Sequence, residues 1–268
     1  MGRARLITSA ATVAIAGLAL AGCTSAEPTP AADPAASEQS SNGAYAATVK
    51  QAAQTTKSAN SAEMAGSVEI ITGGSATELD LNGKVDFTSE NFEGILSADL
   101  LGAGTEIKLR VVDETAYASV PFLGEGWIEA PAVTGVSTGV PVDLLGTLRK
   151  LGDVEEVGQE TINDVTTTHY RGTLNIKTAL KSLGLSAEDL EGTQGALRDL
   201  GKDAVIDVWI DDQDRIVKVS QEVSGTTDAG TTSGVASTFE FSNFGVPVDV
   251  KKPKDIIDPD LGGLIPQP

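Results

Sequence analysis

The sequence predicts a single α+β domain: a strongly curved antiparallel β half-barrel of about ten or eleven strands, with helices packed on its concave face. Between Met64 and Phe241, apolar residues recur at every second position in many short segments, which is typical of strands with one buried face. Leucine-rich segments with helical spacing interrupt this pattern only a few times. Neither a second core nor an internal repeat is visible in the 268 residues, so one domain is expected.

The first 22 residues have the layout of a secretory signal peptide. Arg3 and Arg5 form a short positive n-region, and the uncharged apolar stretch LITSAATVAIAGLALAG follows them. The stretch leads into LAGC at residues 20–23, which resembles the bacterial lipobox. This resemblance implies cleavage before Cys23, a diacylglyceryl group on its thiol, and a lipid-anchored chain on the extracytoplasmic face of the cell membrane. An ordinary signal peptide and an N-terminal anchor helix that stays uncleaved are the alternatives.

Composition divides the rest of the chain into a tether, a folded domain and a tail. Cys23 is the only cysteine, which excludes a disulfide within one chain. Residues 23–43 are rich in Pro, Ala and Ser and lack large apolar side chains, which predicts a flexible tether. The folded domain is expected over residues 44–258. Five prolines after residue 246 predict an extended strap, and residues 259–268 are expected to form a loose tail.

The folded domain begins with a predicted helix over residues 44–60, an alanine-rich stretch that follows the Asn42-Gly43 pair. After it, alternation with a period of two predicts a series of strands, and short turns containing Gly or Asp join them into antiparallel hairpins. These strands are expected over residues 64–71, 79–87, 92–100, 105–113 and 115–123.

The second half of the domain mixes helices with hairpins. Leucines at helical spacing predict a helix over residues 140–152, and residues 175–201 are expected to form two short helices. Between them, residues 153–175 read as a hairpin that turns at Asn163-Asp164. Residues 203–224 predict another hairpin, turning at residues 212–214, and residues 236–245 supply a closing strand.

Composition also argues against several classes of function. The chain has 38 Asp and Glu against 19 Lys and Arg, a formal net charge of −19, so nucleic-acid binding is not expected. His169 is the only histidine, and no Gly-x-Ser-x-Gly elbow supplies a nucleophile, so His169 is expected to be an ordinary strand residue and the chain not an enzyme. A zinc site would need several Cys or His ligands. Residues 211–215, DDQDR, lack the Gly and Glu positions of a calcium loop and predict a solvated turn, so neither a metal nor a cofactor is expected.

Three stretches resemble a known family. They are GEGWIEA around Trp127, VEEVGQETINDVTTTHYRGTLN at residues 154–175, and VIDVWIDDQDRIVKV at residues 205–219. In this order they are similar to the LppX/LprAFG-type actinobacterial lipoprotein family, which has a LolA-like fold, and the resemblance covers residues 44 to 258. It implies an open half-barrel with an apolar cavity, in a protein that carries acylated lipid or lipoglycan across the cell envelope. An export partner in the envelope is compatible with this function. No motif in the sequence names the lipid.

The alternation of the strands also predicts which side chains would line such a cavity. The candidates are apolar residues on the face turned toward the helices, together with two from the helix over residues 140–152. They are Val68, Ile70, Leu79, Leu81, Leu96, Leu109, Val111, Val120, Phe122, Leu144 and Leu148. A dry slot of this kind would favour an acyl chain by about 0.8 kcal/mol for each methylene removed from water.

The same residues would form a filled core if the helices occupied the whole concave face. In that case the fold would present its surface to a protein partner, as a non-enzymatic envelope binding or sensor module. Aromatic residues, which fill space efficiently, make up only 4% of the chain, and this scarcity favours a cavity. The two hypotheses differ in whether acyl lipid binds to the purified protein.

Overall fold

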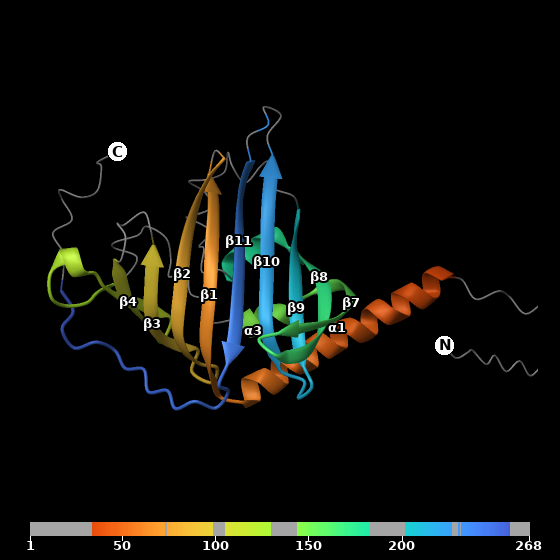
Figure 1. Cartoon of the computed structure of the whole chain (residues 1–268), viewed down its shortest axis with the longest axis horizontal. Helices are drawn as coiled ribbons and strands as arrows, with labels where there is room; N and C mark the ends of the chain where they lie inside the picture. The colour runs from red at the N-terminus through yellow and green to blue at the C-terminus, as the bar shows by residue number, and fades with distance from the viewer. Residues whose placement is uncertain are drawn as a thin grey trace, which may run out of the picture.

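The computed structural model describes residues 34–72, 74–98, 105–129, 144–182, 202–226, 230 and 232–257. Within them the chain forms one eleven-stranded antiparallel sheet and a few helices (Figure 1). The strands are β1 (Ser61–Thr72), β2 (Ser75–Asp86), β3 (Asn91–Ala98), β4 (Glu106–Val112), β5 (Thr115–Ser119), β6 (Ile128–Glu129), β7 (Gly152–Ile162), β8 (Val165–Asn175), β9 (Asp203–Asp211), β10 (Ile216–Thr226) and β11 (Thr232–Ser242). The helices are α1 (Pro34–Ser58), α3 (Leu144–Leu148) and α4 (Ile176–Ser182), with a 3₁₀ turn, η2, at Pro121–Leu123.

The sheet consists of two meanders joined at its centre. The strand order is β6-β5-β4-β3-β2-β1-β11-β10-β9-β8-β7, so neighbours in the sheet are neighbours in sequence at every place but one. At that place the first strand, β1, pairs with the last, β11, and Glu63 lies opposite Ser242. β6 and β7 are the two edges and do not pair with each other, so the sheet is open. The prediction of an α+β domain built on an open antiparallel sheet is confirmed.

Residues at the tight turns suit this topology. β7 and β8 are joined by Asn163 and Asp164, whose φ angles are 49° and 65°. Two successive positive φ angles are the geometry of a type I′ turn, which Asn and Asp tolerate and which matches the twist of paired strands. The hairpin predicted to turn at these two residues is therefore confirmed. The turn between β9 and β10 also falls where the sequence predicts it, with Asp214 at a φ of 57°.

Several elements differ from their predicted bounds, among them β1, β2 and β11, which begin three or four residues earlier than predicted. The helix predicted over residues 44–60 is present, but α1 begins earlier, at Pro34, and so includes residues 34–43 of the predicted flexible tether. Proline is well tolerated at the first position of a helix, where its missing N–H has no partner to lose. The strand predicted over residues 115–123 ends at Ser119 because Pro121 begins the 3₁₀ turn. The helix predicted over residues 140–152 is described from Leu144, and β7 begins already at Gly152.

Other predicted segments lie outside the described residues. They are the signal peptide, the lipobox with Cys23, the first part of the tether, the tail at residues 259–268, and residues 183–201 of the two predicted helices, of which α4 is the described part.

The helices pack on one face of the sheet, here called the inner face. α1 contributes Val49, Ala52 and Ala53 to the core, and α3 contributes Leu144 and Leu148. Alternate residues of the strands complete the core from the sheet side, among them Leu81, Val85, Phe92, Leu109, Val111, Ile206, Val208, Val219, Phe239 and Phe241. The residues between them face the opposite side, here called the outer face. That the inner face is the concave one stays a prediction.

Two glycines allow the central strands to carry a large aromatic residue. Gly83 of β2 lies opposite Gly94 of β3, and the ring of Phe92 covers both. A Cβ atom at Gly83 would lie 2.6 Å from Cζ of Phe92, and one at Gly94 would lie 2.5 Å from the same atom. Only glycine therefore fits at these two positions beneath the ring.

In the described part of the chain, no helix combines the length and apolar composition needed to cross a bilayer.

Candidate functional site

The structure places more than half of the predicted cavity-lining residues within the packed core. Their side chains are buried against the helices or the neighbouring strands. These residues are Leu81, Leu109, Val111, Val120, Leu144 and Leu148. Phe122 lies in η2, but its side chain falls outside the described residues.

The remaining predicted residues form an apolar surface that is only partly covered. Val68 and Ile70 of β1, Leu79 of β2 and Leu96 of β3 lie on the inner face, toward the β1–β2 hairpin. Val235 of β11 lies opposite Ile70. We call these five residues the open apolar surface. Ile70 is 36% exposed and the other four are half-buried; of these, Val68, Leu96 and Val235 contact the core at its margin.

Uneven cover by the helices explains why this surface is open. α1 and α4 lie over β7 to β10, on the side of β11 away from β1 and the open apolar surface (Figure 1). In those strands the equivalent inner-face residues, such as Ile206 of β9 and Val223 of β10, are buried. No described helix contacts β1, β2 or β3 to a comparable extent. Apolar side chains at this end of the inner face are therefore left in contact with solvent.

Polar side chains border the open apolar surface next to α4. Ser237 of β11 lies between Val68 of β1 and Gln221 of β10. The amide nitrogen of Gln221 donates to the carbonyl of Ala179 at 3.1 Å, and the hydroxyl of Ser182 contacts the Gln221 amide oxygen at 3.3 Å. Ser182, Gln221 and Ser237 are buried. Hydroxyl and amide groups thus stand directly beside exposed aliphatic side chains, an arrangement suited to an amphiphilic ligand.

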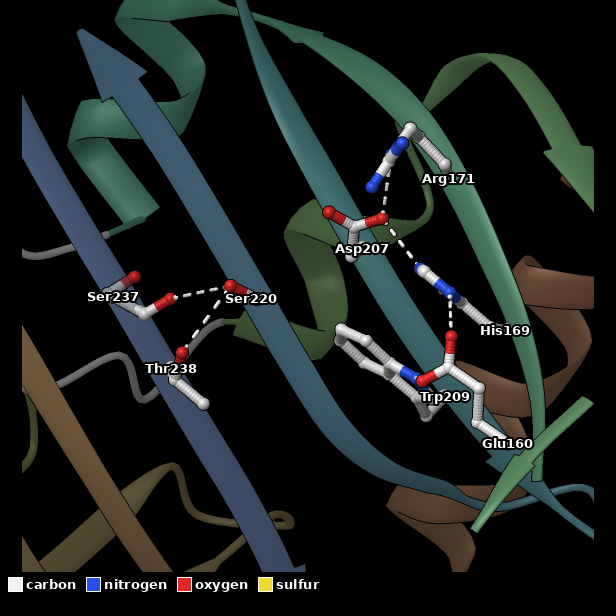
Figure 2. Close-up of polar contacts among 8 residues, drawn as sticks. All are labelled: Glu160, His169, Arg171, Asp207, Trp209, Ser220, Ser237 and Thr238. Carbon is white, nitrogen blue, oxygen red and sulfur yellow. Dashed lines mark hydrogen bonds and ion pairs between the residues drawn. The ribbon is translucent and has the colours of Figure 1, made fainter. Parts of the chain in front are cut away.

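A second notable group lies on the outer face and involves the only histidine (Figure 2). Nδ1 of His169 lies 2.8 Å from Oε1 of Glu160, and Nε2 lies 2.6 Å from Oδ1 of Asp207. The imidazole stacks on the indole of Trp209 with ring centroids 4.3 Å apart, and Arg171 donates to the same oxygen of Asp207 at 2.8 Å. We call these five residues the outer-face cluster. The His169 side chain is only 6% exposed.

The outer-face cluster joins side chains of three neighbouring strands, β7, β8 and β9. Both ring nitrogens of His169 face carboxylate oxygens, one on β7 and one on β9. Glu160 also accepts a hydrogen bond from the indole N–H of Trp209 at 2.8 Å. Hydrogen bonds from Trp209 and His169 hold the pKa of Glu160 below its usual value of 4.5.

Sequence analysis misses this cluster for an identifiable reason. Alternation places His169 and Arg171 on one face of β8, and Asp207 and Trp209 on one face of β9. It does not reveal that β8 lies beside β9 with His169 opposite Trp209, because the two strands are separated by α4 and the residues after it. The expectation of an ordinary strand-surface histidine is therefore corrected: His169 is buried within a charged cluster. The described residues contain no group of three or more His, Cys, Asp or Glu that could hold a metal ion.

Acid should weaken the outer-face cluster. Because the folded-state pKa of Glu160 lies below 4.5, its carboxylate contributes stability at higher pH, and this contribution is lost as the pH falls through the folded-state pKa. We expect the free energy of unfolding in urea to decline between about pH 5 and pH 3, and Glu160→Gln to make that decline shallower. The matched control is Glu78→Gln, which removes an exposed carboxylate of β2 outside the cluster. Equal pH dependence in the two variants would contradict the expectation.

Comparisons with known proteins agree with the fold. A family model described as LppX_LprAFG lipoprotein matches residues 44–250. An uncharacterized 31.2 kDa protein from the rplA-rplJ intergenic region of Streptomyces griseus is 26% identical over 247 residues, covering 79% of this chain and 78% of the relative.

Solved structures are similar as well. The lipoprotein LppX of Mycobacterium tuberculosis aligns with a TM-score of 0.52 at 17% identity, covering 79% of this chain and all of that one. LprF of Mycobacterium bovis aligns with a TM-score of 0.47 at 14% identity, covering 78% of this chain and 97% of that one. The match to the family model spans most of the folded domain. The chain belongs to the LppX_LprAFG lipoprotein family.

Proposed function

We propose that this protein is a membrane-anchored envelope lipoprotein that binds acylated lipid or lipoglycan and carries or chaperones it across the cell envelope. The open apolar surface is the single observation that carries the proposal. It consists of aliphatic side chains on the inner face of a sheet, at the place where the described helices leave that face uncovered. Membership of a lipoprotein family supports the same function.

The physical chemistry of this surface suits an acyl chain. Val68, Ile70 and Leu79 are neighbours across β1 and β2, so one hydrocarbon tail can contact all three. Each methylene that leaves water contributes about 0.8 kcal/mol, and a tail of ordinary length therefore contributes several kcal/mol before the entropy of ordering it is subtracted. The buried Ser237 and Gln221 give this surface a polar border beside Val68.

Cys23 completes the proposal as the point of attachment. A diacylglyceryl group on this cysteine would hold the protein on the extracytoplasmic face of the membrane, because two acyl chains anchor far more firmly than one. Residues between Cys23 and α1 would then set how far the domain can move from the bilayer.

A charged residue within the open apolar surface should weaken lipid binding. We expect the purified chain to release acyl lipid on extraction with organic solvent, detected by mass spectrometry, and to take up a fluorescent fatty acid. Leu79→Asp should weaken this uptake by about tenfold or more, because a carboxylate in an apolar contact costs more than 1.4 kcal/mol. Val205→Asp is the matched control, since Val205 is 42% exposed but belongs to the outer side of β9. Equal uptake by the two variants would contradict the proposal.

The alternative is a non-enzymatic envelope module that binds a protein and has a filled core. One observation favours it: Leu109, Val111, Leu148 and other predicted lining residues are buried in the core. The same experiment separates the two functions. If the extract contains no lipid and the unmodified chain takes up no fatty acid, the result supports the protein-binding module and ends the carrier proposal.

A further inference from the structure

The C-terminal strap brings lysines to one end of the outer face. After β11, residues 246–257 run beneath the strand ends toward β4 and η2 (Figure 1). Nη1 of Arg110, on β4, donates to the carbonyl of Lys251 at 3.4 Å. The strap then pairs with Trp127: its N–H donates to the carbonyl of Asp255 at 2.8 Å, and Ile257 donates to the carbonyl of Trp127 at 2.7 Å. The basic residues of the strap are thereby fixed beside those of the sheet.

A shallow surface depression of about 360 Å³, here called the cavity, lies over β2, β3 and β4 beside Trp127. Lys84 of β2 and Lys108 and Arg110 of β4 line it, with Trp127 at one side. Its floor is the backbone around Gly83 and Gly94, the pair of glycines covered by Phe92 on the inner face, and the remaining lining residues are Asn82, Glu93, Ile95 and Leu109. The cavity therefore opens on the outer face, on the side of the sheet opposite the core.

Basic residues of the sheet line this opening, and the strap carries three more beside the same strands, where it contacts Arg110, Tyr117 and Trp127; we call the six the basic patch. They are Lys84, Lys108, Arg110, Lys251, Lys252 and Lys254. Within the described residues, Arg110 lies 3.6 Å from Glu93 and Lys251 is paired with Asp249, but the other four have no carboxylate within 4.0 Å. Lys252 instead lies 5.5 Å from the ring centroid of Tyr117. In a chain with a net charge of −19, this area therefore concentrates cations.

Exposed apolar side chains lie among these cations. Ile95 of β3 is 37% exposed and lines the cavity with the half-buried Trp127, and Ile256 of the strap, 40% exposed, pairs with Trp127 through a backbone bridge. Cations near a tryptophan and exposed isoleucines are a combination found where proteins rest on a membrane interface. An acidic protein or a nucleic acid would complement the cations but would leave the isoleucines without apolar partners.

We propose that the basic patch docks this domain on a membrane that contains anionic phospholipids, with Trp127 at the level of the headgroups. The cavity between Lys84, Lys108 and Arg110 receives a lipid phosphate, and the isoleucines contact the underlying glycerol and acyl region. This docking does not require a lipid on the open apolar surface, which lies on the opposite face of the sheet.

The test places the full chain in vesicles and asks whether Trp127 meets the headgroups. Vesicles contain equal parts of phosphatidylglycerol and phosphatidylcholine, or phosphatidylcholine alone, each with a headgroup spin label that quenches tryptophan fluorescence. Trp127→Phe separates the signal of Trp127 from that of Trp209, the other tryptophan of the chain. We expect strong quenching of Trp127 in the anionic vesicles, weak quenching in the neutral ones, and loss of the difference in about 1 M salt, where the Debye length is about 3 Å.

Charge variants decide whether the basic patch is responsible. Replacing Lys84, Lys108 and Lys254 together with glutamine should reduce the quenching of Trp127 at least threefold. The matched control replaces Lys50, Lys177 and Lys202, three exposed lysines elsewhere in the domain, with glutamine. This variant should retain the quenching of Trp127. Equal quenching in neutral and anionic vesicles, or equal loss in the two triple variants, would overturn the proposal. Uptake of the fluorescent fatty acid should be the same in both, so failure here is distinct from failure of the lipid-carrier function.

Discussion

Gly94→Ala should lower the free energy of unfolding by about 3 kcal/mol, although it adds a single methyl group. The new Cβ would lie 2.3 Å from the backbone oxygen of Asn82 and 2.5 Å from Cζ of Phe92. Neither neighbour can withdraw cheaply, because Asn82 belongs to the paired strand β2 and Phe92 is fully buried in the core. The two strands must therefore separate locally or the ring must leave its place. Urea unfolding followed by far-ultraviolet circular dichroism measures the loss.

A second glycine of the chain provides the control. Gly43 lies in α1, where a Cβ would meet nothing within 4 Å. Gly43→Ala should raise the stability slightly, by up to about 1 kcal/mol, because alanine favours the helix. The two variants make the same chemical change, so opposite signs would isolate the effect of close packing. Similar stabilities in both would show that β2 and β3 can move apart without cost.

Asp211→Ala should be comparably damaging, with an expected loss of about 3 kcal/mol. The buried carboxylate of Asp211 closes the turn between β9 and β10: one oxygen accepts the backbone N–H of Gln213 at 3.0 Å and that of Arg215 at 2.8 Å. The other accepts Nε and Nη2 of Arg215 at 2.9 and 2.7 Å. Truncation would leave two N–H groups and a partly buried guanidinium, which lies 4.4 Å from the ring centroid of Phe244, without their acceptor.

Two variants in the same turn test this explanation. Asp211→Asn keeps an oxygen for the backbone but removes the charge, so it should lose less stability than Asp211→Ala. Asp212→Ala changes the exposed neighbour and should stay within about 0.5 kcal/mol of the unmodified chain. Both are measured by the same urea titration. A loss at Asp212 equal to that at Asp211 would assign the effect to the turn as a whole and contradict the role of the buried ion pair.

This turn illustrates how far the sequence alone reaches. The residues DDQDR correctly predict a turn, since Asp, Gln and Asp are polar and follow an alternating strand. They do not reveal that Asp211 is buried while Asp212 is exposed, because burial depends on what packs over the hairpin. The strands themselves were predictable, because the alternation of apolar and polar residues can be seen within each segment. Which strands lie side by side depends on residues far apart in sequence. Neither the pairing of β1 with β11 nor that of His169 with Glu160 and Asp207 could therefore be derived.

Prediction of the candidate site shows the same limit. Alternation assigned apolar residues of β1, β2 and β3, such as Leu79, to one face, and the pairing register of these strands places them together on the inner face. It gave Leu79 and Leu109 equal standing, yet one is half-buried and the other fully buried, because alternation within a strand does not show what packs over each side chain. Low hydrophobicity suggested a tether through residue 43, whereas α1 extends back to Pro34, and proline is well tolerated at the first position of a helix.

The junction of β1 with β11 has a consequence for how the chain matures. A polypeptide emerging from a ribosome or a translocation channel exposes β1 early, but the strand that belongs beside it ends only at Ser242. Until then β1 and β10 each carry an unsatisfied ladder of backbone donors and acceptors at the middle of the future sheet. Pairing β1 with β11 over this long separation in sequence costs chain entropy and is slow, so this pairing is expected to form late in folding. The topology thus delays folding until nearly the whole polypeptide has emerged.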